Sequence, residues 1–170
     1  RTGDVIMIEL RRKIGQLALI ADVSVVGVGL TGGSGAIAGA PASVNADAGG
    51  LALYGYDPVA YTADGKATAG DPAVTATHDG ATYRFSTPAH RDAFVKEPER
   101  YLPVFGGYCA YGVAQGYKVK VDPEAWSIVD DKLYLNYDSG VRKLWSKDTA
   151  GFIAAAAKKW SSIEDEPRSD

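Results

Sequence analysis

The chain of 170 residues has a single cysteine, Cys109, in the glycine-rich stretch FGGYCAYGVAQG at residues 105–116. One cysteine cannot form a disulfide within the chain, and it excludes zinc sites built from four cysteines. The fold must therefore be stabilised by the packing of apolar side chains. A chain of this length, with 46% hydrophobic and 23% charged residues, can bury a sufficient core without a disulfide or a metal ion.

The charge balance limits the classes of partner. The formal net charge is −3, and the longest run of basic residues is the triplet at 11–13. Nucleic-acid-binding domains carry a basic patch or stripe, so we expect no nucleic-acid partner.

Residues 1–46 have the composition of an export signal or a disordered leader. A basic start is followed by an apolar, glycine-rich middle and by small residues, with Val44 and Ala46 at the two small positions before a candidate cleavage point. A stable membrane anchor is not expected, because the stretch 14–37 contains Asp22 and six glycines, whereas a spanning helix needs about 20 mainly apolar residues. We therefore predict a periplasmic or secreted protein.

Residues 47–163 are predicted to form one small α+β domain of β-hairpins interleaved with short helices, followed by a charged tail at 164–170. Two segments combine β-branched and aromatic residues around short turns, which predicts hairpins. Capping residues followed by apolar residues at helical spacing predict helices. The hairpins are expected at 74–85 and 125–137, and the longer helices at 86–102, 138–148 and 149–163. No repeat recurs at the spacing of solenoid proteins.

Three roles are open to Cys109. It follows two glycines in the first turn of an expected short helix, a position that favours a thiolate and hence a nucleophile. Together with His90 it has the donor atoms of a copper or zinc site. However, free cysteine is among the most buried residue types, and Phe105 and Val113 share its helix face, which indicates an inert core side chain. His90 is in turn either a ligand or a histidine packed on its helix.

Tyrosines are frequent throughout the predicted domain. Four of them are candidates for lining a ligand cleft: Tyr56, Tyr83, Tyr108 and Tyr111. The alternative is a core rim, in which each ring is buried and its hydroxyl is hydrogen-bonded near the surface. The sequence leaves both arrangements open.

Four sequence blocks follow one another in the domain: GYDPVAY (55–61), GATYRFSTPAHRDAF (80–94), GGYCAYGVAQG (106–116) and DPEAWSIVDDKLYLNY (122–137). Together they resemble the YHS-domain family, and in particular its small exported branch. The similarity spans about residues 51–160, nearly the whole predicted domain, in the expected order.

The resemblance implies a metal-binding role, because metal-binding YHS modules hold their ion with cysteines and occur beside heavy-metal and copper pumps. Residues 57–59 match the first motif of these modules. Four residues match the second: Tyr83, Phe85, Arg91 and Phe94. At the three cysteine positions this chain has Ala60, Ser86 and His90. The implied ion is copper ahead of zinc.

From these observations we expect an exported, non-enzymatic accessory or binding protein that binds a transition metal through Cys109 and His90. One alternative is a thiol-dependent enzyme or redox protein that uses the same two residues. Another is a protein-interaction module with a tyrosine-rich face. The expected partner is accordingly a metal ion or another protein of the cell envelope.

Overall fold

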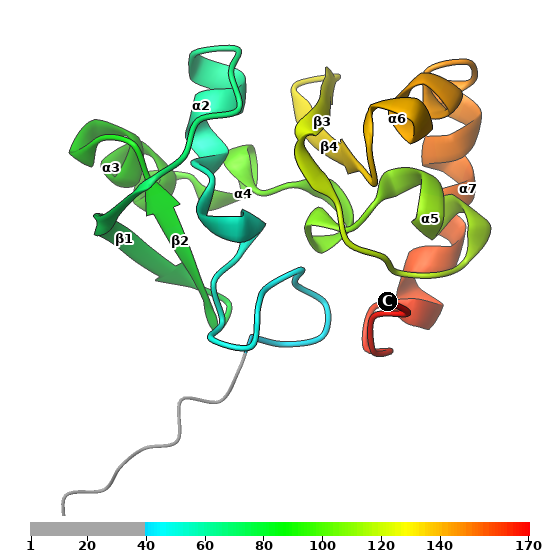
Figure 1. Ribbon diagram of the computed structural model, residues 1–170, viewed down its shortest axis with the longest axis horizontal. Coiled ribbons are helices and arrows are strands. Elements are labelled where there is room, and N and C mark those ends of the chain that lie inside the picture. The colour runs from blue at the N-terminus through cyan, green and yellow to red at the C-terminus, as the bar shows by residue number, and fades with distance from the viewer. Residues whose placement is uncertain (1–39) are drawn as a thin grey trace, which may run out of the picture. The chain divides into compact units, whose positions relative to one another are not determined.

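Two antiparallel β-hairpins, each followed by helices, make up the part of the chain that the computed structural model describes, residues 40–170 (Figure 1). The elements in chain order are η1 (Leu53–Gly55), α2 (Pro58–Ala63), β1 (Asp71–His78), β2 (Ala81–Phe85), α3 (Pro88–Lys96), α4 (Pro98–Tyr101), η2 (Val104–Gly107), α5 (Ala110–Gln115), β3 (Asp122–Val129), β4 (Lys132–Asn136), α6 (Ser139–Trp145) and α7 (Thr149–Ile163). The predicted α+β class, with helices at the C-terminal end, is confirmed. Within this region no helix has the length and apolar character needed to cross a membrane.

Both hairpins turn through two residues, as the sequence predicted. Asp79 and Gly80 join β1 to β2 with φ angles of 46° and 75°, and Asp130 and Asp131 join β3 to β4 with φ angles of 49° and 59°. Left-handed backbone at both turn residues matches the twist of the paired strands. Short polar side chains and glycine adopt this conformation more readily than other residues.

A cap and a proline set the boundaries of the helices after the first hairpin. Thr87 caps α3 by accepting a hydrogen bond at 3.1 Å from the backbone N–H of His90. Pro98 lacks the N–H that would continue this helix. The segment 86–102 is therefore divided into α3 and α4.

The two halves of the described region repeat one structural unit. Residues 53–55 have φ angles of 53°, 53° and 80°, and residues 105–107, 52 positions later, have φ angles of 57°, 60° and 81°. Each of these turns leads into a capped helix, whose capping side chain is Asp57 for α2 and Cys109 for α5. A hairpin and a further capped helix then follow in both halves.

The hairpins of the two halves also correspond, at a spacing of 51 positions. Both begin with an Asp-Pro pair, whose aspartate accepts a hydrogen bond at 2.8 or 2.9 Å from the backbone N–H two residues later. Tyr83 packs on Phe94 with the ring centroids 5.0 Å apart and 38° between the ring planes, and Tyr134 packs on Trp145 at 5.5 Å and 37°. The sequence analysis missed this repeat, because the two copies share backbone conformation more than residue types.

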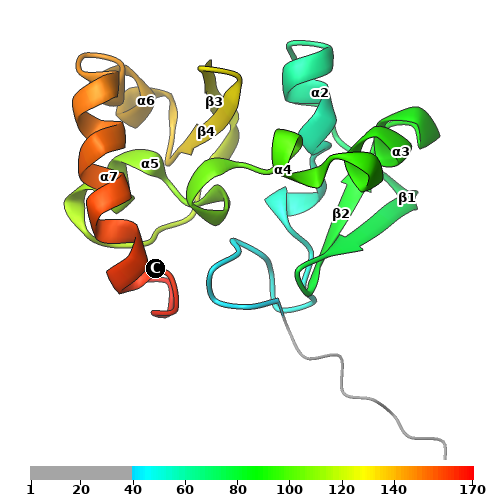
Figure 2. The same ribbon diagram turned by 180° about the vertical axis from the view of Figure 1, so that it is seen from behind.

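The core is continuous between the halves. Leu133 and Leu135 of β4 lie in the same buried cluster as Phe85 of β2. The Tyr61 hydroxyl of α2 donates a hydrogen bond at 3.1 Å to the backbone oxygen of Pro123 in β3. In the second half, α7 lies along α5 (Figure 2).

Residues 40–46, which the sequence analysis assigned to the leader, pack as part of the folded unit. Asn45 is buried, and its Nδ2 donates to the Gly107 carbonyl at 3.0 Å. Tyr108 and the buried Lys118 both donate to the Ala42 carbonyl, at 2.8 and 2.7 Å. The remainder of the predicted leader lies outside the described residues.

The C-terminal tail, predicted at residues 164–170, also contacts the domain. The backbone N–H of Ser169 donates to the Lys118 carbonyl at 2.8 Å, and Asp170 accepts from the backbone N–H of Lys120 at 3.2 Å. These contacts place the tail beside the segment that follows α5.

Candidate functional site

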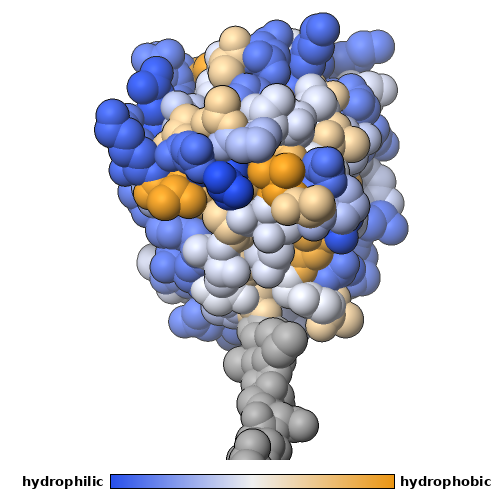
Figure 3. All heavy atoms as spheres, turned by 90° about the vertical axis from the view of Figure 1, so that its left-hand side faces the viewer, coloured by the Kyte–Doolittle hydropathy of each residue, from blue (hydrophilic) through white to orange (hydrophobic). Residues whose placement is uncertain are grey.

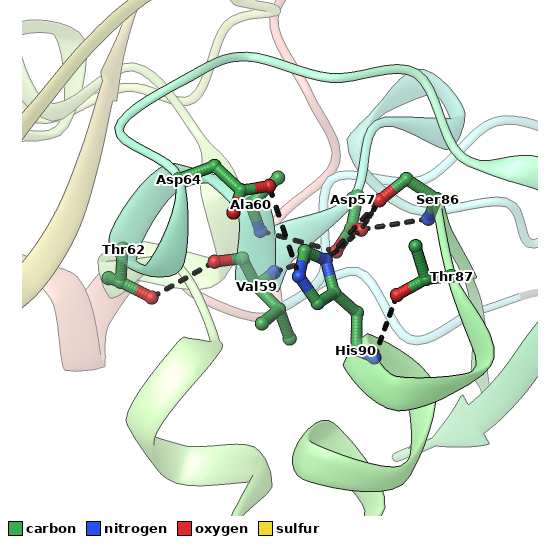
Figure 4. A network of polar contacts seen from close by, with 8 residues as sticks. All are labelled: Asp57, Val59, Ala60, Thr62, Asp64, Ser86, Thr87 and His90. Carbon is green, nitrogen blue, oxygen red and sulfur yellow. Dashed lines mark hydrogen bonds and ion pairs between the residues drawn. The ribbon is translucent and has the colours of Figure 1, made fainter.

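The buried carboxylate of Asp57 is the centre of a polar network (Figure 4). Its Oδ1 accepts from the backbone N–H groups of Val59 and Ala60, at 2.9 and 3.3 Å, as the cap of α2. Its Oδ2 accepts from the Ser86 N–H at 2.8 Å, the Ser86 hydroxyl at 2.6 Å and His90 Nδ1 at 2.7 Å. Five donors thus compensate the cost of burying this carboxylate.

This network fixes the orientation of His90. Because the Asp57 carboxylate accepts, Nδ1 carries a proton, and in the neutral imidazole the lone pair is on Nε2. The His90 side chain is 17% exposed, and Nε2 faces Oδ2 of Asp64 at 3.8 Å. The site therefore presents one oriented nitrogen and one carboxylate toward solvent.

The arrangement of Ser86 differs from that of a catalytic triad. In a triad the nucleophilic hydroxyl is hydrogen-bonded to the histidine nitrogen opposite the carboxylate. Here the Ser86 hydroxyl lies 3.3 Å from Nδ1 of His90, on the same side as Asp57. The network therefore orients His90 without activating Ser86 as a nucleophile.

The three positions at which the family resemblance places cysteines converge on Asp57. Ala60 donates its backbone N–H to this carboxylate, Ser86 donates both its N–H and its hydroxyl, and His90 donates Nδ1–H. They come from α2, the end of β2 and α3 (Figure 4). A hydrogen-bonded carboxylate thus connects three elements at this point.

Cys109 lies in a separate, buried environment. It is 1% exposed, its Sγ accepts a hydrogen bond from the Gly112 N–H at 3.4 Å, and it lies 3.9 Å from Asn136 Oδ1. Burial raises the pKa of the Cys109 thiol, which opposes formation of a thiolate. Among the polar contacts of residues 40–170, none joins Cys109 to His90.

The four candidate tyrosines do not share one cleft. Tyr83 and Tyr108 are buried, whereas Tyr56 and Tyr111 are half-buried. Tyr108 donates its hydroxyl to the N-terminal segment, and the ring of Tyr111 packs on Phe152 with centroids 5.1 Å apart. Tyr83 lines a cavity of about 440 Å³ that none of the other three borders.

Asp57 and Asp64 are the functional candidates that the sequence analysis missed. Asp57 precedes Pro58, and an Asp-Pro pair at a helix start is a common capping arrangement, so the sequence indicated a cap rather than a site. Asp64 lies at the end of α2 and approaches His90 only through the packing of α2 against α3. No local sequence signal identifies such a pair.

The donor set limits the coordination that this site offers. Within residues 40–170, no group of three or more histidine, cysteine, aspartate or glutamate side chains is arranged to hold a metal ion. His90 and Asp64 therefore supply two donors at most. The cysteine cluster of the metal-binding YHS modules has no counterpart among them.

Comparison with known proteins gives no relative. The chain matches no protein-family model, and no curated protein and no solved structure is significantly similar to it.

Proposed function

We propose that this protein is an exported, non-enzymatic accessory protein that binds a transition metal ion, copper ahead of zinc, at His90. The observation that carries the proposal is the fixed Nδ1 of His90, held by Asp57 at 2.7 Å, which leaves Nε2 beside Asp64. A carboxylate bonded to the second ring nitrogen is the usual support of a metal-binding histidine. The resemblance to YHS modules points to the same class of ligand.

The distance between the two donors fits a shared ion. Bonds from histidine nitrogen and carboxylate oxygen to zinc are about 2.0–2.2 Å, so two such donors on one tetrahedral ion lie about 3.4 Å apart. His90 Nε2 and Asp64 Oδ2 are 3.8 Å apart, and the half-exposed Asp64 side chain is free to move closer. The remaining positions would be filled by water, which suits a protein that exchanges its ion.

We expect the site to bind copper more tightly than zinc because of the types of donor atom that it offers. For a given set of nitrogen and oxygen donors, affinity is higher for Cu²⁺ than for Zn²⁺. A site with one imidazole and one carboxylate lacks the thiolates that favour Cu(I). We therefore expect Cu²⁺ as the bound form.

The other two hypotheses receive less support. A thiol-dependent enzyme needs an accessible, low-pKa cysteine, and Cys109 is buried. A tyrosine-rich interaction surface needs a contiguous apolar patch. On the face of the described residues that Figure 3 shows, the most hydrophobic side chains form small separate groups with hydrophilic ones between them.

Titration of the full chain with Cu²⁺ tests the proposal, with protein purified without chelators or metal-affinity resin. Isothermal titration calorimetry is expected to give one Cu²⁺ per chain, and electron paramagnetic resonance to show coupling to one imidazole nitrogen. His90→Gln should abolish binding, and Asp64→Asn, at an exposed site, should weaken it about tenfold or more.

The only other histidine provides the matched control. His78→Gln should bind Cu²⁺ as tightly as the unchanged chain, since His78 lies outside the Asp57 network. An absence of Cu²⁺ uptake, or an equal loss in the two histidine variants, would overturn the proposal.

A further inference from the structure

The N-terminal segment at residues 40–46 is bound to the domain through a buried asparagine. Asn45 is only 2% exposed. Its backbone N–H and its Nδ2 donate to the carbonyls of Gly106 and Gly107, at 2.9 and 3.0 Å. Its Oδ1 accepts from Nη1 of Arg168 at 3.4 Å, so the C-terminal tail contacts the same side chain. The segment thus joins η2 to the end of the chain.

Two buried side chains of the second half find hydrogen-bond acceptors in this segment. The Tyr108 hydroxyl donates to the carbonyls of Ala42 and Val44, at 2.8 and 3.2 Å. The ammonium group of Lys118, a residue that is 1% exposed, donates to the carbonyls of Ala42 and Glu164, both at 2.7 Å. A charged group is costly to bury unless it is hydrogen-bonded. Loss of Ala42 would therefore remove one of the two carbonyl acceptors that compensate the burial of Lys118.

The cleavage point that the sequence analysis considered, after Ala46, lies inside this folded region. The Ala46 N–H donates to the Val44 carbonyl at 2.9 Å, the Asp47 N–H donates to the Leu51 carbonyl at 3.0 Å, and Ala46 forms a β-bridge with Ala52. A cut after Ala46 would remove all the contacts of the segment 40–46 from the mature protein. The folded domain therefore begins before Ala46, and a removable signal must end earlier in the chain.

The sequence contains earlier bonds that match the requirement of small residues at the first and third positions before a cut. Three bonds follow two alanines at this spacing: Ala38–Gly39, Ala40–Pro41 and Ala42–Ser43. A cut at the last of them would release the Ala42 carbonyl, to which Tyr108 and Lys118 donate. The middle one is disfavoured because proline has no backbone N–H and a fixed φ. The Ala38–Gly39 bond is the one that leaves the folded segment complete.

We propose that the peptidase which removes the export signal cleaves the Ala38–Gly39 bond, so that the mature protein begins at Gly39 and keeps the segment 40–46. Water is added across this peptide bond, which leaves a carboxylate on Ala38 and an amino group on Gly39. The inference rests on the export that is part of the proposed function. It replaces the cut after Ala46 that the sequence alone indicated.

Expression of the full chain in a Gram-negative bacterium tests this proposal. The periplasmic and cytoplasmic fractions are separated, and the intact mass and the N-terminal sequence of the chain are determined in each. We expect a periplasmic chain whose sequence begins GAPAS, from Gly39 to Ser43. The location of the chain reports on export, and its first residue reports on the position of the cut.

A matched pair of variants places the same β-branched side chain before each of the two competing bonds. Ala38→Val is expected to raise the ratio of uncleaved to cleaved chain about tenfold or more, because valine is too bulky for the position directly before the cut. Ala46→Val is the control and should leave both the ratio and the start at Gly39 unchanged. Valine suits the β-bridge that Ala46 forms with Ala52, so this variant is expected to fold.

Two results would overturn this inference and leave export intact. They are a periplasmic chain that begins at a residue other than Gly39, such as Ser43 or Asp47, and a block of cleavage by Ala46→Val but not by Ala38→Val. A full-length chain found only in the cytoplasm would contradict both the cut and the export itself. Cu²⁺ titration of the purified chain reports on the metal site alone, so the failure of that proposal is recognised separately.

Discussion

Asp57 and Cys109 occupy equivalent positions in the two halves and differ in chemistry. Both cap a short helix by accepting a backbone hydrogen bond. The carboxylate of Asp57 also holds His90, whereas the sulfur of Cys109 lies in the core near Asn136. The equivalent position therefore belongs to a polar network that reaches the surface through His90 in the first half and is a buried cap in the second.

The buried thiol gives a pH-dependent prediction. The pKa of Cys109 is raised in the folded protein, so above about pH 8.5 the unfolded chain loses a proton that the folded chain keeps. Stability is thus lost as pH rises from the ordinary thiol pKa toward the raised one. Guanidinium unfolding between pH 7.5 and 9.5 should show a smaller decrease in unfolding free energy for Cys109→Ala than for the unchanged chain.

Removal of the Cys109 side chain also lowers the unfolding free energy at every pH. This constant loss does not affect the comparison, which concerns how steeply the unfolding free energy falls with pH in the two proteins. Buried tyrosines such as Tyr61 and Tyr83 also have raised pKa values, but their effect starts near pH 10 and is common to both proteins. Equal slopes in the two proteins would contradict the prediction.

The positive-φ turn before each capped helix is the element that the two halves share most closely. In the second half, Gly106 has φ of 60°, and a Cβ there would overlap the backbone oxygen of Ser43. This turn is also where the segment 40–46 docks, since the backbone N–H of Asn45 donates to the Gly106 carbonyl at 2.9 Å. The absence of a side chain at Gly106 thus permits the N-terminal segment to pack.

Substitution of this glycine tests the close approach. Gly106→Ala is expected to lower the unfolding free energy by about 2–3 kcal/mol, through backbone strain and displacement of the N-terminal segment. Gly65→Ala is the matched control, because Gly65 has φ of 64° but nothing within 4 Å of an added Cβ. It should cost only about 1 kcal/mol, and equal costs in urea unfolding would show that no close contact exists at Gly106.

The halves are duplicated in structure but are not expected to fold separately. Leu135 of the second hairpin is fully buried in the core cluster that includes Phe85 of the first. A core cluster that contains side chains of both halves couples their stabilities, so unfolding should be a single cooperative transition.

Truncation of Leu135 tests whether the two halves unfold together. Leu135→Ala is expected to lower the unfolding free energy by about 3 kcal/mol while far-ultraviolet circular dichroism and tryptophan fluorescence still report one midpoint. Leu144→Ala, at a side chain that is 45% exposed on α6, should cost less than about 1 kcal/mol. Two separated midpoints would contradict the coupling, because all three tryptophans lie in the second half.

Local sequence signals determined the hairpins, the helix caps and the α+β class, because turn conformation and capping depend on residues close together in the chain. His90 was also named from sequence as a candidate site residue. Its partners were not, since Asp57 and His90 are 33 residues apart and meet only when α2 and α3 pack. The burial of Cys109 and the cavity around Tyr83 likewise come from long-range packing, which fixes the surroundings of each polar group. The residue types were thus set by the sequence, whereas the tertiary structure decided which of them face each other, the core or solvent.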